Sequence, residues 1–188
     1  MNKTAAAVYL MAIACSSFAT EVSGIKVDDK ATVGGQELVL NGAGMRSRLF
    51  IKVYVGALYV PQKTSTAQGV IGRNQPRRMA LALQRDVDAD QLLEALRAGL
   101  SDNNSQADLD EIKPQVEQFA TIFRSVGAAR AGQTIGIDYT PAEGTVIRLD
   151  GAVKGTIAGE AFNKALFNTW LGERPVQESL KKALLGIG

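Results

Sequence analysis

An alternation of apolar and polar positions predicts one long β-strand over residues 49–60. Its odd positions are all apolar, and they are Leu49, Ile51, Val53, Val55, Ala57 and Tyr59. Its even positions mix apolar, polar and charged side chains. Because successive side chains of a strand point to opposite faces, we expect the odd face to pack in the core. The even face is then a cleft wall or a half-wet surface.

Shorter alternations predict strands in two further parts of the chain. Small strands joined by tight glycine turns are expected within residues 21–40. Later strands are expected at residues 79–83, 134–139, 145–149 and 152–157. Asp150-Gly151 between the last two is a strong two-residue hairpin signal, so the final three strands should form a meander.

Apolar residues at helical spacing predict two blocks of helices. In the middle of the chain, Asp88 caps a helix that ends near residues 99–103, and Pro114 either kinks the next helix or opens a new one. The C-terminal block comprises residues 160–171 and a last helix that begins at Pro175. Strands and helices in separate blocks favour an α+β domain with a largely antiparallel sheet.

The N-terminal pattern predicts a secretory signal peptide over residues 1–19 and a mature domain over residues 20–188. A charged start precedes an apolar run over residues 5–14 and a small-residue site that ends at Ala19. The run is too short to span a membrane, so we expect a periplasmic protein without a membrane span, which the intact mass of the envelope protein tests. Two alternatives stay open: lipidation of Cys15, or an uncleaved N-terminus of a cytosolic protein.

The absence of histidine and the single cysteine exclude several kinds of site. The chain has no His, and its one cysteine, Cys15, lies in the predicted signal peptide. Ser-His-Asp and Cys-His catalysis and zinc sites with His or Cys ligands are therefore excluded from the mature domain. We expect neither a metal nor a cofactor.

The charge balance gives no sign of nucleic-acid binding. The sequence has 21 basic and 19 acidic side chains. Its one basic cluster, residues 73–78, surrounds Pro76 and lacks interleaved aromatic residues. We interpret this cluster as a solvated turn that leads into a strand, and we expect no nucleic-acid partner.

Two motifs resemble those of the chalcone isomerase family. The stretch over residues 41–61 reads Gly-Ala-Gly-Met-Arg and then an apolar strand, and is similar to the family's Gly-x-Gly-x-Arg turn beside a cleft strand. Residues 168–173, Asn-Thr-Trp-Leu-Gly-Glu, are similar to its Thr-x-x-Gly-Glu helix end. The resemblance implies an open-faced sandwich, in which helices cover one face of a large antiparallel sheet and a ligand cleft lies between them. It points to an exported bacterial member of a fold that also includes fatty-acid binding proteins.

Arg46 is the first candidate site residue. In the family the matching arginine polarises a ketone, and a guanidinium presents a rigid fork of donors that suits a carbonyl or a carboxylate. Arg46 and not Arg48 follows the Gly-x-Gly-x spacing. The alternative is that Arg46, like Arg48, is a loop arginine that reaches solvent.

Tyr54 and Thr169 are the other two candidates for ligand contact. Tyr54 stands where plant chalcone isomerases carry a threonine that holds a catalytic water, so the cleft should have another shape; the alternative is a packing tyrosine. Thr169 matches a family threonine that contacts the ligand. Its alternative is a hydroxyl bonded to the carbonyl four residues earlier in its helix. Trp170 is interpreted as a packing residue, and Lys52 as a surface lysine.

One departure from the family leaves catalysis open. Active members carry a tyrosine just before the helix that Asp88 caps, whereas residues 85–90 here read Arg-Asp-Val-Asp-Ala-Asp. The first hypothesis is therefore binding of a small apolar, fatty-acid-like molecule whose carbonyl or carboxylate head meets Arg46. Alternatives are an isomerase or intramolecular lyase that acts on a chalcone-type ketone through Arg46 and Tyr54, and an envelope interaction protein with a closed cleft. The oligomeric state is left open.

Overall fold

The computed structural model describes residues 19–187, so the predicted signal peptide, with Cys15, lies outside the described residues except for Ala19. In chain order the elements are β1 (Ala19–Val22), β2 (Ile25–Asp28), β3 (Lys30–Val33), β4 (Gln36–Arg48), β5 (Ile51–Val60), α1 (Ala67–Ile71), β6 (Arg77–Leu83), β7 (Val87–Asp88), α2 (Ala89–Asn103), α3 (Gln106–Glu111), α4 (Lys113–Val126), β8 (Ala128–Ala129), β9 (Thr134–Thr140), β10 (Gly144–Leu149), β11 (Ala152–Ile157), α5 (Glu160–Leu171) and α6 (Glu178–Leu184). Within the described part of the chain, no helix is both long and apolar enough to cross a membrane.

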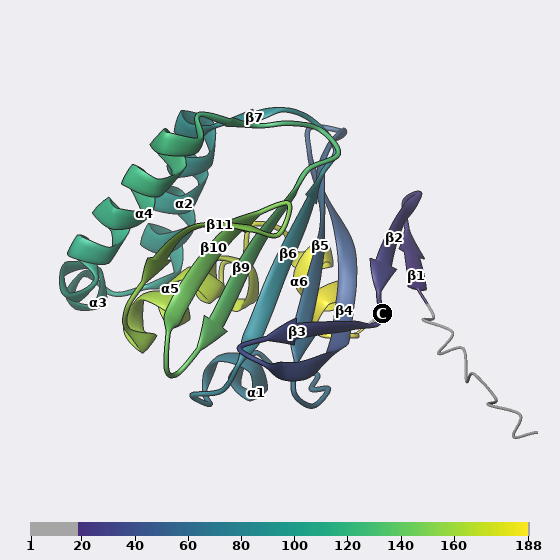
Figure 1. Ribbon diagram of the computed structural model, residues 1–188, viewed down its shortest axis with the longest axis horizontal. Coiled ribbons are helices and arrows are strands. Elements are labelled where there is room, and N and C mark those ends of the chain that lie inside the picture. The colour runs from purple at the N-terminus through teal and green to yellow at the C-terminus, as the bar shows by residue number, and fades with distance from the viewer. Residues whose placement is uncertain (1–18, 188) are drawn as a thin grey trace, which may run out of the picture.

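A seven-stranded sheet forms the centre of the molecule. Its strand order is β11-β10-β9-β6-β5-β4-β3, and every neighbouring pair is antiparallel. Figure 1 shows α2, α4, α5 and α6 gathered on one side of the curled sheet and the β1–β2 hairpin apart from them. The predicted α+β class, with one face of an antiparallel sheet covered by helices, is confirmed.

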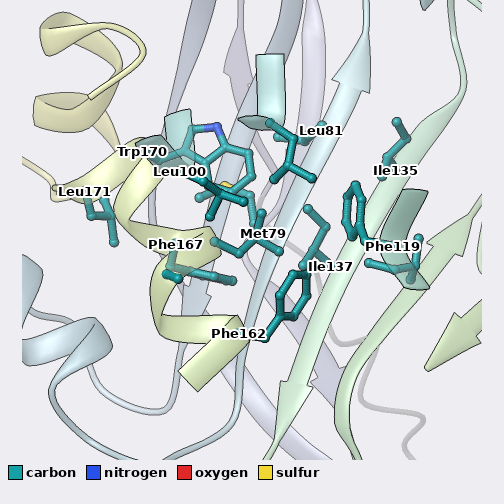
Figure 2. Close-up of a cluster of buried hydrophobic side chains, with 14 of the residues drawn as sticks. Met79, Leu81, Leu100, Phe119, Ile135, Ile137, Phe162, Phe167, Trp170 and Leu171 are labelled. Atoms are coloured by element: carbon teal, nitrogen blue, oxygen red, sulfur yellow. The ribbon is translucent and has the colours of Figure 1, made fainter. Parts of the chain in front are cut away.

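The main core lies between the sheet and these helices. Figure 2 shows its centre, which consists of Met79 and Leu81 from β6, Ile135 and Ile137 from β9, Leu100 from α2, Phe119 from α4, and Phe162, Phe167, Trp170 and Leu171 from α5. The Phe119 ring lies 4.4 Å from the Phe123 ring and 6.0 Å from the Phe162 ring, measured between centroids. These rings join α4 and α5 over the sheet.

Both faces of β5 are buried, which corrects the prediction for this strand. The even residues Tyr54 and Leu58 belong to the main core under the helices. The odd residues Val55, Ala57 and Tyr59 pack in a smaller cluster with residues of β2, β3 and β4. The even face is therefore both core and cleft wall. Gly56 and Lys52 made this face look less buried than it is. Gly56 leaves room for a neighbouring helix, and Lys52 lies at the exposed end of the strand.

A β-bulge at Asn41 decides which face of β4 meets the helices. Leu40 pairs with Tyr59 and Gly42 pairs with Leu58, so Asn41 has no partner on β5. Residues before the bulge, such as Leu40, face the smaller cluster. Because one extra residue reverses the alternation, the later even residue Arg46 lies on the helix side, beside Tyr54.

Gly42 and Gly44 lie inside strand β4, so the predicted Gly-x-Gly-x-Arg turn is wrong. A Cβ on Gly42 would lie 2.0 Å from the Ala183 carbonyl oxygen, and one on Gly44 would lie 2.6 Å from the Ala183 Cβ. The two glycines lie on the face that α6 covers, and their missing side chains let the helix approach the strand. The turn comes later, at Leu49 and Phe50.

The predicted helix start at Asp88 is confirmed, and the one at Pro175 is wrong. The Asp88 carboxylate accepts a hydrogen bond of 2.7 Å from the Gln91 N–H at the start of α2. Pro114 opens a new helix, α4, in its first turn. After Pro175, the Gln177 side chain accepts a bond of 2.9 Å from the Ser47 N–H of β4. The chain therefore crosses to the sheet before α6 begins at Glu178.

The basic cluster is not a solvated turn, because Arg77 is fully buried at the start of β6. Its guanidinium donates to the Asn163 side-chain oxygen at 2.7 Å and to the carbonyls of Val70 and Arg73 at 3.1 and 3.0 Å. It also lies 4.5 Å from the centroid of the Tyr139 ring. Burial lowers the pKa of Arg77 to about 10, so at neutral pH it remains a buried cation.

The close approach of α6 to β4 yields a first prediction. Gly42→Ala should lower the free energy of unfolding by about 3 kcal/mol or more, because its Cβ would collide with a backbone carbonyl. Gly136→Ala in β9 is the control, since its Cβ would meet Arg148 at an ordinary 3.4 Å; stability should be unchanged or about 0.5 kcal/mol higher. Urea titration of both variants checks this. Equal stabilities would contradict the packing role of Gly42.

Candidate functional site

A cavity of about 660 Å³ lies between the sheet and the helices. This volume falls within the range of roughly 300–1,000 Å³ that is typical of small-molecule sites. Much of its wall is apolar and comes from β6, β9, α2, α4 and α5, with Leu81, Ile135, Ile137, Leu96, Phe119 and Leu166 among the lining residues. The wall is suited to a molecule with a substantial hydrocarbon part.

The three predicted site residues all line this cavity. Arg46 comes from β4, Tyr54 from the neighbouring strand β5, and Thr169 from the last turn of α5. The fold therefore brings together residues that are far apart in the sequence. Their polar groups line the same cavity as the apolar residues of β6, β9, α2, α4 and α5.

Arg46 and Tyr54 are a cross-strand pair. They are directly opposite in the β4–β5 register, and the guanidinium carbon of Arg46 lies 5.8 Å from the centroid of the Tyr54 ring. The register shifts again after Arg46, which leaves Val53 without a partner on β4. Arg46 is half-buried, and no carboxylate of residues 19–187 forms an ion pair with it. Its donors are available to a ligand.

Tyr54 is a buried phenol that keeps its proton. Burial raises its pKa to about 12, against the opposing effects of the Arg46 charge and of a hydrogen bond from Trp170. The Trp170 indole N–H donates to the Tyr54 hydroxyl oxygen at 2.8 Å. Because indole is only a donor, the Tyr54 hydrogen is left to donate to another group. No acceptor for it is found among residues 19–187.

Trp170 has a place in the cavity wall that the sequence did not predict. It does pack, as expected, with its ring 6.1 Å from the Phe167 ring. It also lines the cavity and orients the Tyr54 hydroxyl. One signal was present in the sequence, since a buried tryptophan usually finds an acceptor for its N–H. The sequence did not show which acceptor that would be.

Thr169 has a buried hydroxyl without a hydrogen bond. The residue is only 4% exposed, and its Oγ1 has no partner in the described part of the chain. The alternative of a bond to the carbonyl four residues earlier is therefore not what the structure has. Gly99 of α2 packs against Thr169, and a Cβ at Gly99 would lie 2.3 Å from the Thr169 Cγ2. Glycine at this position lets α2 and α5 approach closely.

Charged residues surround the rest of the cavity. Arg48, Arg85 and Arg174 line it together with Glu94 and Asp102 of α2. Arg48 does not follow the Gly-x-Gly-x spacing, yet it is both exposed and part of the cavity wall. Lys52 is exposed and does not line the cavity.

The segment before α2 has a structural role. The Asp86 carboxylate accepts bonds from the Ala131 N–H at 2.9 Å and from Arg130 at 2.8 Å, and these bonds lower its pKa. Asp88 caps the helix. Neither residue is among those that line the cavity. Across residues 19–187, no cluster of His, Cys, Asp or Glu is arranged to hold a metal ion.

Comparison with known proteins gives a family and a fold. The profile of a family described as chalcone isomerase-like matches residues 19–186. No curated protein matches the chain. Among solved structures, 36 chains match. One is the crystal structure of a fatty-acid binding protein from Arabidopsis thaliana, with a TM-score of 0.67, 14% sequence identity, and coverage of 87% of this chain and 92% of that chain. At this identity the match shows a common fold.

The unpartnered hydroxyl yields a second prediction. Thr169→Val should raise the free energy of unfolding of the ligand-free protein by about 1 kcal/mol, because it replaces an unsatisfied buried hydroxyl by a methyl group of similar size. Thr145→Val is the control. Its buried hydroxyl accepts a bond of 3.0 Å from the Asn163 amide, and removing it should cost about 1–3 kcal/mol. Thermal and urea unfolding measure the stability of both variants. A loss of stability in both would contradict the conclusion that the Thr169 hydroxyl is unsatisfied.

Proposed function

This chain belongs to the chalcone isomerase-like family, and we propose that it binds a small amphipathic molecule of fatty-acid type in the cavity between the sheet and the helices. One observation carries the proposal. A charged fork, a protonated phenol and an unpartnered hydroxyl, those of Arg46, Tyr54 and Thr169, line the cavity together with a substantial apolar wall. Such a site combines hydrogen-bond donors for a head group with a surface for a hydrocarbon tail.

The donors define the head group that the site accepts. Arginine has only donors, and the Tyr54 oxygen already accepts from Trp170. A carboxylate or a carbonyl oxygen is therefore the complementary group, and a carboxylate additionally offsets the Arg46 charge. The tail would lie against the apolar residues of β6, β9 and α4. The name of the Arabidopsis neighbour, a fatty-acid binding protein, supports this class of ligand.

An isomerase or intramolecular lyase is the second candidate function. Arg46 and the neutral Tyr54 can both donate to a ketone oxygen that gains negative charge, which favours catalysis of this kind. The segment before α2 carries no tyrosine, and its Asp86 and Asp88 accept hydrogen bonds from the backbone. We therefore expect no turnover of a chalcone at an enzyme-like rate. Stereospecific cyclisation followed by absorbance and chiral chromatography would favour the enzyme instead.

An interaction protein with a closed cleft is the least supported candidate. A cavity of about 660 Å³ with an unpaired arginine in its wall is not needed by a protein that docks only through its surface. Mass spectrometry of a solvent extract from the protein purified out of its own cell would identify a bound ligand directly. An extract without any small molecule would favour the interaction protein.

The role of Arg46 yields a third prediction. Arg46→Ala should weaken the binding of oleate by roughly 10-fold to 150-fold, because a charge-assisted hydrogen bond in a largely apolar site is lost. Arg46→Lys should also bind more weakly, since one ammonium does not reproduce the guanidinium fork. Displacement of a fluorescent fatty acid measures the affinities.

Two controls separate this binding defect from unfolding. Arg124→Ala removes an exposed arginine on α4 that does not line the cavity, and it should bind oleate as the wild type does. Melting temperatures without ligand should change little for Arg46→Ala, because Arg46 forms no ion pair within residues 19–187. Wild-type affinity in Arg46→Ala would remove Arg46 from the site and with it the proposed head-group contact.

A further inference from the structure

Four hairpins of the described chain have the same two-residue turn geometry. In each of them both turn residues have positive φ, and the turns are Ser23-Gly24, Gly34-Gly35, Leu49-Phe50 and Asp150-Gly151. Three turns use glycine with a small or polar residue, as this geometry favours. The turn between β4 and β5 uses leucine and phenylalanine instead, with φ of 48° and 68°.

This choice of residues does not serve the hairpin itself. A left-handed backbone is strained for residues that carry a Cβ, and bulky side chains are rare there. The other three hairpins show that the chain can form the same turn with residues suited to it. Strain of this kind is retained where it has a function.

The side chains of the turn contact almost nothing in the fold. Phe50 is fully exposed, Leu49 is 85% exposed and the following Ile51 is 54% exposed. The other large hydrophobic residues exposed within residues 19–187, Val153 and Ile187, stand singly. Three consecutive exposed apolar residues at the end of a hairpin are typical of an interaction site. We call residues 49–51 the apolar tip.

Basic residues flank the apolar tip. Arg48 precedes it and Lys52 follows it, both exposed, and residues 46–52 contain no acidic residue. Arg85 follows β6, where the Gln84 N–H bonds to the Val53 carbonyl at 2.8 Å. The acidic residue that follows Arg85 in the sequence, Asp86, is engaged by Arg130 and the Ala131 N–H. Apolar side chains beside cations are complementary to a bilayer with anionic lipids.

We propose that the apolar tip docks the protein on an anionic lipid bilayer, with Leu49 and Phe50 inserted among the lipids and Arg48 and Lys52 at the head groups. The tip adjoins the cavity, because Arg46, Arg48 and Val53 of the same hairpin line it. Docking would place the cavity at the membrane surface, where a fatty acid can pass between bilayer and protein. That last purpose rests on the proposed function, whereas docking itself does not.

The test uses the full chain and vesicles of two compositions. The wild type should sediment with vesicles of phosphatidylglycerol and phosphatidylethanolamine and bind at least about tenfold more weakly to pure phosphatidylcholine. Leu49→Asn/Phe50→Gly should lose about tenfold or more of the binding to the anionic vesicles, since two apolar side chains no longer insert. The same variant should melt at an equal or higher temperature, because Asn-Gly suits the turn.

Matched variants identify the tip as the inserted part. Val153→Ser removes an exposed apolar side chain from β11 and should bind vesicles as the wild type does. Emission from Phe50→Trp should shift to the blue with anionic vesicles, and emission from Val153→Trp should not. Lys52→Glu should weaken binding to the anionic vesicles. Unchanged vesicle binding by Leu49→Asn/Phe50→Gly, or no blue shift from Phe50→Trp, overturns the proposal and leaves a protein partner for the tip.

The same variants separate docking from ligand binding. Leu49→Asn/Phe50→Gly should bind oleate in solution with wild-type affinity, because neither residue lines the cavity. If the wild type does not bind oleate and still docks through the tip, the proposed ligand fails and the docking site stands. If oleate binds and no variant of the tip affects the vesicles, the proposed function stands and the docking site fails.

Discussion

The bulge at Asn41 is the constraint on which the cavity depends. The Asn41 amide donates to the carbonyls of Thr64 and Leu184 at 3.0 and 2.7 Å, and its oxygen accepts from the Thr64 N–H at 2.8 Å. One buried side chain thus joins strand β4, the chain after β5 and the end of α6. Asn41 is itself the extra residue that reverses the alternation of β4, and these bonds hold it in place. Without that residue, Arg46 would face the smaller cluster, and the cavity would lose the cation that lies beside Tyr54.

Burial then determines the chemistry of the polar groups in the cavity. A phenol in an apolar surrounding keeps its proton, so Tyr54 is a donor and not an anion beside Arg46. The Trp170 N–H donates to the phenol oxygen, and the Thr169 hydroxyl has no hydrogen-bond partner in the described chain. The buried Thr169 hydroxyl, which has no partner within residues 19–187, costs stability in the empty protein. The apolar tip also has a cost without a gain in packing, since Leu49 and Phe50 form a strained turn and remain exposed.

The sequence predicted features that local chemistry decides and missed those that distant contacts decide. The Asp150-Gly151 turn and the Asp88 cap were right because each depends on neighbouring residues. The glycines at 42 and 44 were read as a turn, although they make room for α6, which lies at the other end of the chain. Arg77 was expected in solvent for the same reason, since its acceptor Asn163 comes from α5. The three candidate site residues came from the family resemblance, whereas the hydrogen bond from Trp170 to Tyr54 required the structure.

Arg77 and Arg46 show how differently one fold can surround a guanidinium. Arg77 is fully buried, and oxygens of α5 and of the chain before β6 accept from two of its nitrogens. These acceptors compensate for part of the lost hydration and hold the residue in the core, whereas its Nη2 has no hydrogen-bond partner among the described residues. Arg46 also lies by an aromatic ring, yet it is only half-buried and no carboxylate of the described chain forms an ion pair with it. Its donors are held in place by the sheet and left open to the cavity, which is the state that a site for an anionic head group requires.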